Sequence, residues 1–301
     1  ALVLRTTKYS PNLNGANRWF VFPGISFQPS ELAKIALIIA LAWYCERYQR
    51  QMHTWKRGML VPSLFIGLIA GLIFVERDVG CALLITLVSG LMLLIAGIQL
   101  KQFVPSVLAL AVAASIFIYN DDVRRERVVA WLNMEEKKSE KASQAYQTML
   151  ALGSGGWTGL GLGNGRQKNG WVAEHQTDFI LAIIGEELGL VATLGVVLGF
   201  VLIVLCGIYI AVHARDTFSL MLAAGITFLI GFQAFINIGV VTNTLPNKGI
   251  ALPFISYGGS SLLAMLGCIG LLISVARQGR APEIKPANPF AADELPTAQT
   301  T

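Results

Sequence analysis

Charged residues are scarce in this chain of 301 residues, since only 14% of them are Asp, Glu, Lys or Arg. A soluble domain usually contains about 25% charged residues. Hydrophobic residues make up 54% of the chain, and its mean hydropathy is +0.60. The low charge excludes an ordinary soluble domain and predicts a polytopic membrane protein.

Acidic residues are fewer than basic ones, 18 against 23, so the formal net charge is +5. In a soluble protein this balance would suggest nucleic acid as a partner. In a membrane protein the ordinary cause is Lys and Arg in the cytoplasmic loops that flank the helices. We therefore expect the membrane as a partner, and no nucleic acid.

Cysteine and histidine are rare, at four and three residues. Each cysteine lies in apolar sequence, without the spacing of a metal site or a disulfide framework and without a neighbouring histidine. This pattern predicts small, buried core residues. The four are Cys45, Cys81, Cys206 and Cys268.

An initiator methionine and a signal-peptide pattern are both absent, because the chain opens on Ala-Leu-Val-Leu-Arg. These residues look like the last turn of an apolar helix, so we expect an N-terminally truncated fragment. At the other end, residues 281–301 are rich in Pro and Ala and have no apolar period, which predicts a disordered cytoplasmic tail. Residues 1–280 would then form one membrane domain.

Long apolar runs dominate the rest of the sequence, and seven of them approach the roughly 20 residues that cross a bilayer. All are predicted helices, because backbone polar groups in lipid must be satisfied within the segment. The fifth run is so long that its start should project from the membrane or the helix should tilt. The expected fold is an all-α polytopic membrane protein with about seven transmembrane helices. The runs are 30–46, 59–75, 79–98, 103–119, 179–212, 217–241 and 251–276.

Most basic residues of the short loops fall on one side of these spans, which predicts that this side is cytoplasmic. Only Arg77 and Lys248 are basic in the short connections of the other side. The large loop, residues 120–178, is nearly neutral and falls on the opposite, extracytoplasmic side. Residues 76–78 and 243–249 share that outer side. The basic residues on the predicted cytoplasmic side are Arg47, Arg50, Lys56, Arg57, Lys101, Arg215, Arg277 and Arg280.

The outer loop ends at Asp178, directly before the apolar run that opens with Phe179. One hypothesis is that partial loss of water at this edge makes the carboxylate a general base. The other is a helix N-cap, since Thr177 or Asp178 before an apolar run is a normal start signal. The pattern alone leaves both open.

Cations on the outer side also have two interpretations. Lys248 precedes a segment interrupted by Pro and Gly, where it suits a phosphate or carboxylate ligand, or is an interfacial residue with an apolar stem. Residues 124–127 include three Arg, which suit bidentate phosphate binding or form a solvated charge run.

Two pairs of acids and one glycine-rich segment remain. Glu186 and Glu187 lie about two turns into the fifth run, where a carboxylate indicates either function or a structural ion pair. Glu76 and Asp78 are either functional or part of a solvated turn. Residues 151–163 are rich in Gly but belong to no βαβ unit, so we reject nucleotide binding and expect a flexible re-entrant or surface loop.

Six motifs, in order along the chain, resemble those of the SEDS family of shape, elongation, division and sporulation proteins. The resemblance implies ten membrane helices with both ends cytoplasmic, of which this chain would hold the fourth to the tenth. Lys248 lies in a Pro-x-Lys-Gly sequence typical of the division branch rather than the elongation branch. The motifs are residues 14–19, 28–34, 124–127, 147 with 153–156, 174–189 and 246–261.

The resemblance implies a peptidoglycan glycosyltransferase that polymerises lipid II into glycan strands at the outer membrane face. It places the enzyme in the bacterial inner membrane at the division septum, with a class B penicillin-binding transpeptidase and other divisome proteins as partners. The alternatives are a lipid II flippase or transporter, an elongation-type polymerase that determines cell shape, and a noncatalytic division scaffold.

The resemblance also assigns roles to residues. Asp178 would be the general base of an inverting transfer. No residue spacing identifies a metal site, and no cofactor is identified, although a divalent cation could share the work of the cations. Two departures from the family pattern are Ala173, where Pro is usual, and His175, which stands one place earlier than usual. The implied substrate-binding residues are Arg18, Arg124, Arg127, Gln147, Glu174, Lys248 and Ser256.

Overall fold

The computed structural model describes residues 20–22, 25–76, 78–122, 125, 129, 131, 140–167, 176–246 and 249–280. A short antiparallel hairpin opens this part of the chain, and helices make up most of the rest. The strands are β1 (Phe20–Phe22) and β2 (Ile25–Phe27). The helices are α1 (Pro29–Arg47), the 3₁₀-helix η2 (Gln49–Gln51), the π-helix η3 (Trp55–Leu60), α2 (Val61–Val75), α3 (Val79–Ile95), α4 (Leu100–Tyr119), α6 (Glu140–Ser154), α7 (Ile180–Val212), α8 (Thr217–Val241) and α9 (Gly259–Arg280).

Each of the seven predicted spans corresponds to a helix, so the predicted all-helical membrane fold is confirmed. Within the described residues, four helical stretches are long and apolar enough to cross a membrane: 55–75, α7, α8 and α9. α3 and the first part of α4 are apolar but shorter. The hairpin was not predicted. The last helix begins at Gly259 rather than near residue 251, because Pro253 and Gly258 interrupt the run that precedes it.

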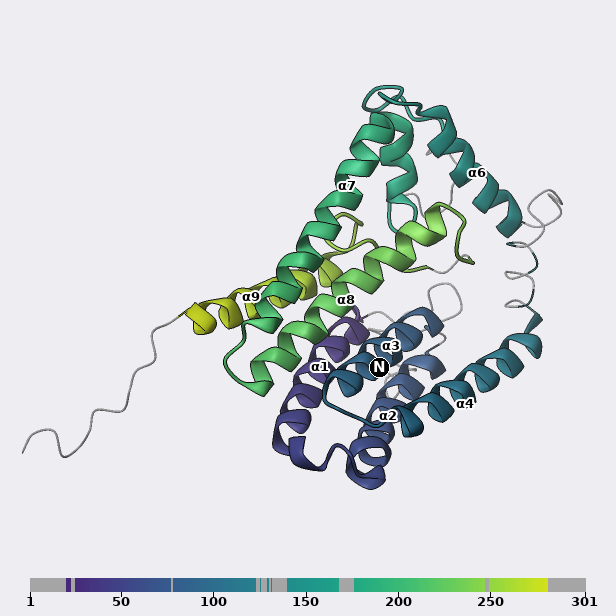
Figure 1. Ribbon diagram of the computed structural model, residues 1–301. Helices are drawn as coiled ribbons and strands as arrows, with labels where there is room; N and C mark the ends of the chain where they lie inside the picture. Colours follow the sequence, from purple (N-terminus) through teal and green to yellow (C-terminus); the bar gives the residue numbers. More distant parts are fainter. Residues whose placement is uncertain are drawn as a thin grey trace, which may run out of the picture.

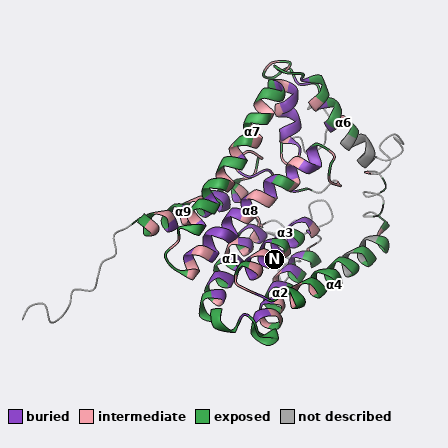
Figure 2. Cartoon of the chain, viewed as in Figure 1, coloured by how far each residue is buried: buried purple, intermediate pink, exposed green. Residues whose placement is uncertain are grey.

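The helix α8 forms the centre of the bundle. It packs against α7, α1, α3 and α9, and most of its side chains are buried. Figure 1 shows α4 at the margin of the molecule, and Figure 2 shows its surface and the outer faces of α2 and α7 exposed. These exposed faces carry large apolar side chains, among them Leu64, Leu108 and Leu198. Lipid would cover such faces in a membrane.

The loops predicted to be cytoplasmic lie together at one end of the bundle. Thr217 Oγ1 donates a hydrogen bond to Gln49 Oε1 at 3.3 Å. A Cβ built at Gly97 would lie 3.8 Å from the ring of His53, and one built at Gly279 would lie 3.0 Å from the carbonyl oxygen of His213. These contacts join the connections α1–α2, α3–α4 and α7–α8 and the last turn of α9, so the grouping by loop charge agrees with the structure.

Cysteine burial agrees with the prediction at three positions and not at the fourth. Cys45, Cys81 and Cys268 are buried, as predicted, whereas Cys206 is exposed. Cys206 lies on α7, whose outer face is apolar and exposed. Apolar sequence around a residue in a membrane helix therefore does not distinguish a core position from a lipid-facing one.

The long helix α7 bends at Gly189, where φ is 78° and ψ is −174°. A Cβ built at Gly185 would lie 3.2 Å from Thr193 Oγ1, so residues before the bend lie against residues after it. Figure 1 accordingly shows a short helical segment beside the long one. The predicted projection or tilt of the fifth span is thus replaced by a sharp bend, after which residues 190–212 form the long segment.

We predict that Gly189→Ala destabilises the protein. This backbone conformation is open essentially only to Gly and costs another residue about 1–3 kcal/mol. The added Cβ would also lie 2.5 Å from both Gly159 N and Trp157 O. Thermal unfolding of the purified protein in detergent measures the effect.

Gly195→Ala is the matched control, since Gly195 lies on the same helix and a Cβ there meets nothing within 4 Å. Replacing a helical Gly by Ala favours the helix by about 1 kcal/mol. Equal melting temperatures for the two variants would contradict a required bend at Gly189.

Candidate functional site

Asp178 lies in the turn that precedes α7 and is half-buried. Phe179 occupies the N-cap position of α7, and its side chain makes no capping hydrogen bond. Neither Thr177 nor Asp178 is therefore the N-cap, and that interpretation of the sequence is wrong. Asp178 therefore lies one residue before the cap, and its backbone is held by other parts of the chain.

The segment 249–257, which precedes α9, holds the backbone of the Asp178 turn. The Tyr257 amide donates a hydrogen bond to the Gln176 carbonyl at 2.9 Å. The Ser256 hydroxyl donates to the Thr177 carbonyl and accepts a bond from the Leu252 amide at 2.7 Å. Ser256, predicted to contact substrate, here joins two loops through backbone groups.

Gly249 lies directly against the side chain of Asp178. A Cβ built at Gly249 would lie 2.5 Å from Asp178 Oδ2, so any side chain at this position would require the Asp178 carboxylate to shift. The neighbouring Ile250 packs near Gly80, at the start of α3. Gly249 follows Lys248 in the sequence, so the structure brings the residue after the predicted cation to the predicted base.

Two amide side chains of α8 reach the same segment from the core. Asn237 Nδ2 donates hydrogen bonds to the carbonyls of Asp178 at 2.8 Å and Ile250 at 2.7 Å. Gln233 Nε2 donates to the carbonyl of Ala251 at 3.0 Å. Both side chains are only 1% exposed. Sequence reasoning missed them, although polar amides within an apolar run were a visible signal.

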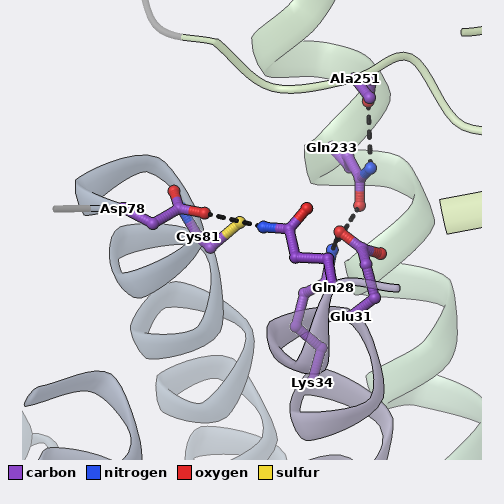
Figure 3. Close-up of polar contacts among 7 residues, drawn as sticks. All are labelled: Gln28, Glu31, Lys34, Asp78, Cys81, Gln233 and Ala251. Carbon is purple, nitrogen blue, oxygen red and sulfur yellow. Dashed lines mark hydrogen bonds and ion pairs between the residues drawn. The ribbon is translucent and has the colours of Figure 1, made fainter. Parts of the chain in front are cut away.

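A buried ion pair continues this polar region into α1 (Figure 3). Lys34 Nζ lies 2.8 Å from Glu31 Oε1 and donates to Gln233 Oε1 at 3.4 Å. Lys34 is 1% exposed and Glu31 6%, so each charge depends on the other for compensation. Both residues lie in a motif that indicated the family, yet no role was predicted for either.

Asp78 belongs to the same end of the bundle, and a solvated turn is the wrong interpretation of it. It is 7% exposed. Its Oδ1 accepts a hydrogen bond from the Cys81 amide at 3.1 Å, which caps α3. Its Oδ2 accepts one from Gln28 Nε2 at 3.3 Å, also shown in Figure 3.

Glu186 and Glu187 both accept hydrogen bonds from the glycine-rich loop. Glu186 Oε1 accepts hydrogen bonds from the amides of Arg166 at 2.8 Å and Gln167 at 3.3 Å. Glu187 accepts from the amides of Gly163 at 3.0 Å and Gly165 at 3.2 Å. The loop after α6 is thus packed around the first part of α7.

The other predicted site residues lie elsewhere or cannot be placed. Gln147 is half-buried on α6, which packs against α7. No group of three or more His, Cys, Asp or Glu that could hold a metal occurs among the described residues. The predicted site residues that lie outside the described residues are Arg18, Arg124, Arg127, Glu174 and Lys248.

Comparison with known proteins gives a match to one family model. Residues 1–281 match the model FTSW_RODA_SPOVE, described as cell cycle protein. A probable peptidoglycan glycosyltransferase FtsW from Geobacter metallireducens is 42% identical over 262 residues, which cover 87% of this chain and 70% of the relative. One from Marinobacter nauticus is 38% identical and covers 93% and 71%.

Two solved structures resemble the fold. A chain from a structure on the coordination of polymerization and crosslinking by a peptidoglycan synthase complex has a TM-score of 0.75 at 26% identity. The match covers 93% of this chain and 79% of that one. The rod shape determining protein RodA of Thermus thermophilus has a TM-score of 0.65 at 25% identity, with 93% and 75% covered.

We predict that Glu187→Gln loosens the glycine-rich loop. The amide keeps one acceptor oxygen but replaces the other with a donor, so one of the two backbone amides of Gly163 and Gly165 loses its partner. Losing such a bond costs about 1–3 kcal/mol where the group is buried. Hydrogen exchange of peptides covering residues 159–167 should accelerate.

Glu46→Gln, at an exposed position near the end of α1, is the control and should leave this exchange unchanged. Unchanged exchange in Glu187→Gln as well would show that its carboxylate does not hold the loop.

Proposed function

This chain belongs to the cell cycle protein family FTSW_RODA_SPOVE, the SEDS family, and we propose that it is a peptidoglycan glycosyltransferase of the FtsW type. Relatives with that name and 38–42% identity support the activity. One observation in the structure supports the site: Asp178 lies beside Gly249, and hydrogen bonds from Asn237 and Ser256 hold the backbone of residues 177 and 178. Its carboxylate is the base we propose.

The proposed substrate is lipid II, which serves as the lipid-linked donor and also supplies the acceptor sugar of the glycan strand. The acceptor hydroxyl oxygen attacks the anomeric carbon of the donor sugar, and the bond from that carbon to undecaprenyl diphosphate breaks. Asp178 takes the hydroxyl proton as the new bond forms. A single displacement from the opposite face inverts the anomeric configuration.

The leaving diphosphate is negatively charged, so cations are proposed to bind it. Arg forms bidentate contacts with phosphate and Lys supplies a point charge. Residue type and family motif support the proposed residues, which are Arg18, Arg124, Arg127 and Lys248, with Glu174 and Gln147 as further substrate contacts.

The exposed apolar surface of the helices suits the polyprenyl chains of the substrate. Large apolar side chains are exposed along α2, α4 and α7, and the proposed base lies at the end opposite the cytoplasmic loops. A class B transpeptidase is the proposed partner, because a structure of a peptidoglycan synthase complex contains a chain of the same fold. We propose the division septum as the location.

Transport of lipid II is less well supported. A transport path would use the acids of the fifth span, but Glu186 is 1% exposed and accepts hydrogen bonds from backbone amides. The elongation branch is also less well supported, since Lys248 and the FtsW relatives favour division.

We predict that Asp178→Asn abolishes glycan polymerisation while lipid II binding persists. A positioned base contributes about 10²–10⁴-fold to a rate, and the amide cannot accept the proton. The assay measures glycan strand formation from lipid II by full-length protein in liposomes, together with its partner, and lipid II binding separately. Glu46→Gln should behave as wild type. Wild-type polymerisation by Asp178→Asn would remove this residue from the mechanism.

Gly249→Ala should also lower polymerisation, by about tenfold or more, because displacement of a catalytic group by about 1 Å costs on the order of 10²-fold. The new Cβ would displace the Asp178 carboxylate. Gly258→Ala is the control in the same segment, since its Cβ would lie 3.7 Å from Ser261 Cβ, an ordinary contact. Equal rates for the two variants would show that the space beside Asp178 is not needed.

A further inference from the structure

Asn237 connects the core of the bundle to two non-helical segments, residues 176–178 and residues 249–257, which together are called the Asp178 junction here. It lies on α8 and is 1% exposed. Its Nδ2 donates one hydrogen bond to the Asp178 carbonyl at 2.8 Å and one to the Ile250 carbonyl at 2.7 Å. A primary amide has two N–H donors, so these two bonds use its full donor capacity.

The orientation of the Asn237 amide follows from its partners. Both are carbonyl oxygens, which only accept, so the nitrogen must face them. Its Oδ1 is buried and has no hydrogen-bond partner among the described residues. The side chain is therefore held by its two donated bonds.

Gln233 extends this arrangement by one helical turn. Residues four apart lie on the same face of a helix, and Gln233 Nε2 donates to the Ala251 carbonyl at 3.0 Å. Two consecutive carbonyls, those of Ile250 and Ala251, are thus held by two side chains of α8. Gln233 donates only to the segment 249–257, whereas Asn237 donates to both segments of the junction.

We propose that Asn237 is a positioning residue, which sets Asp178 at a fixed place relative to the segment that begins at Gly249. The proposal rests on the proposed function, because it concerns the placement of the proposed base. Asn237 acts through the backbone of residue 178 and does not touch the substrate. A small shift of residues 176–178 relative to residues 249–257 would move the Asp178 carboxylate relative to Gly249, against which it now packs.

Two substitutions at Asn237 remove different numbers of its hydrogen-bond donors. Asn237→Leu keeps the approximate shape and removes both donors. In Asn237→Asp the new carboxyl group lies buried between two carbonyls, which favours its neutral form. A neutral carboxyl has one O–H and can donate a single hydrogen bond. We expect kcat for lipid II polymerisation to fall about 30-fold in Asn237→Leu, within the range for a misplaced catalytic group, and about fivefold in Asn237→Asp.

The Michaelis constant for lipid II should change by less than about twofold in both variants, because uniform binding is left intact. Thr227→Val is the matched control. Thr227 is buried on the same helix, and its hydroxyl bonds only the carbonyl of Ala223 one turn away. The control loses one buried polar group and should keep the wild-type kcat.

Full-length protein in liposomes is used throughout, and thermal unfolding gives the folded fraction by which each rate is divided. If Asn237→Leu does not fold, Asn237→Asp decides the result. A reduced kcat per folded molecule with an unchanged Michaelis constant supports positioning. A wild-type kcat per folded molecule, or a raised Michaelis constant with unchanged kcat, overturns it.

Failure of the proposed function gives a different result. In that case wild-type protein does not polymerise lipid II, or Asp178→Asn retains the wild-type rate. Failure of the positioning proposal alone leaves Asp178→Asn inactive and Asn237→Leu active.

Discussion

The joining of residues 176–178 to residues 249–257 is the constraint on which the site depends. Both segments are non-helical and lie beside membrane helices, where each unpaired backbone group costs several kcal/mol unless protein satisfies it. Asn237, Gln233 and Ser256 satisfy carbonyls of these segments. The same bonds leave the carboxylate of Asp178 facing a glycine rather than capping a helix.

The surrounding helices support this junction from the core and from the outer end. The ion pair of Lys34 and Glu31 connects α1 to Gln233, and Asp78 fixes the start of α3. On the other side, the bend at Gly189 and the acids Glu186 and Glu187 pack the glycine-rich loop around the beginning of α7. The turn containing Asp178 therefore leads directly into the first part of α7, which the glycine-rich loop packs around.

Apolar runs were enough to predict the positions of the helices, because bilayer thickness sets their length. They could not predict the bend in α7, since Gly189 is one of several glycines in the same apolar run. Nor could they locate Asn237 and Gln233 as supports, because their partners lie on other segments of the chain. Asp178 was predictable as a candidate, but only the observed start of α7, with Phe179 at the N-cap position, separated it from a helix cap.

The most direct measurement is an experimental structure of the full-length protein with a non-reactive lipid II analogue bound as donor and a short glycan as acceptor. The account predicts that the attacking hydroxyl lies within hydrogen-bond reach of the Asp178 carboxylate, about 2.6–3.2 Å, while Asn237 still bonds residues 178 and 250. An acceptor hydroxyl bound at the cytoplasmic end, or oriented by a different carboxylate, would contradict it.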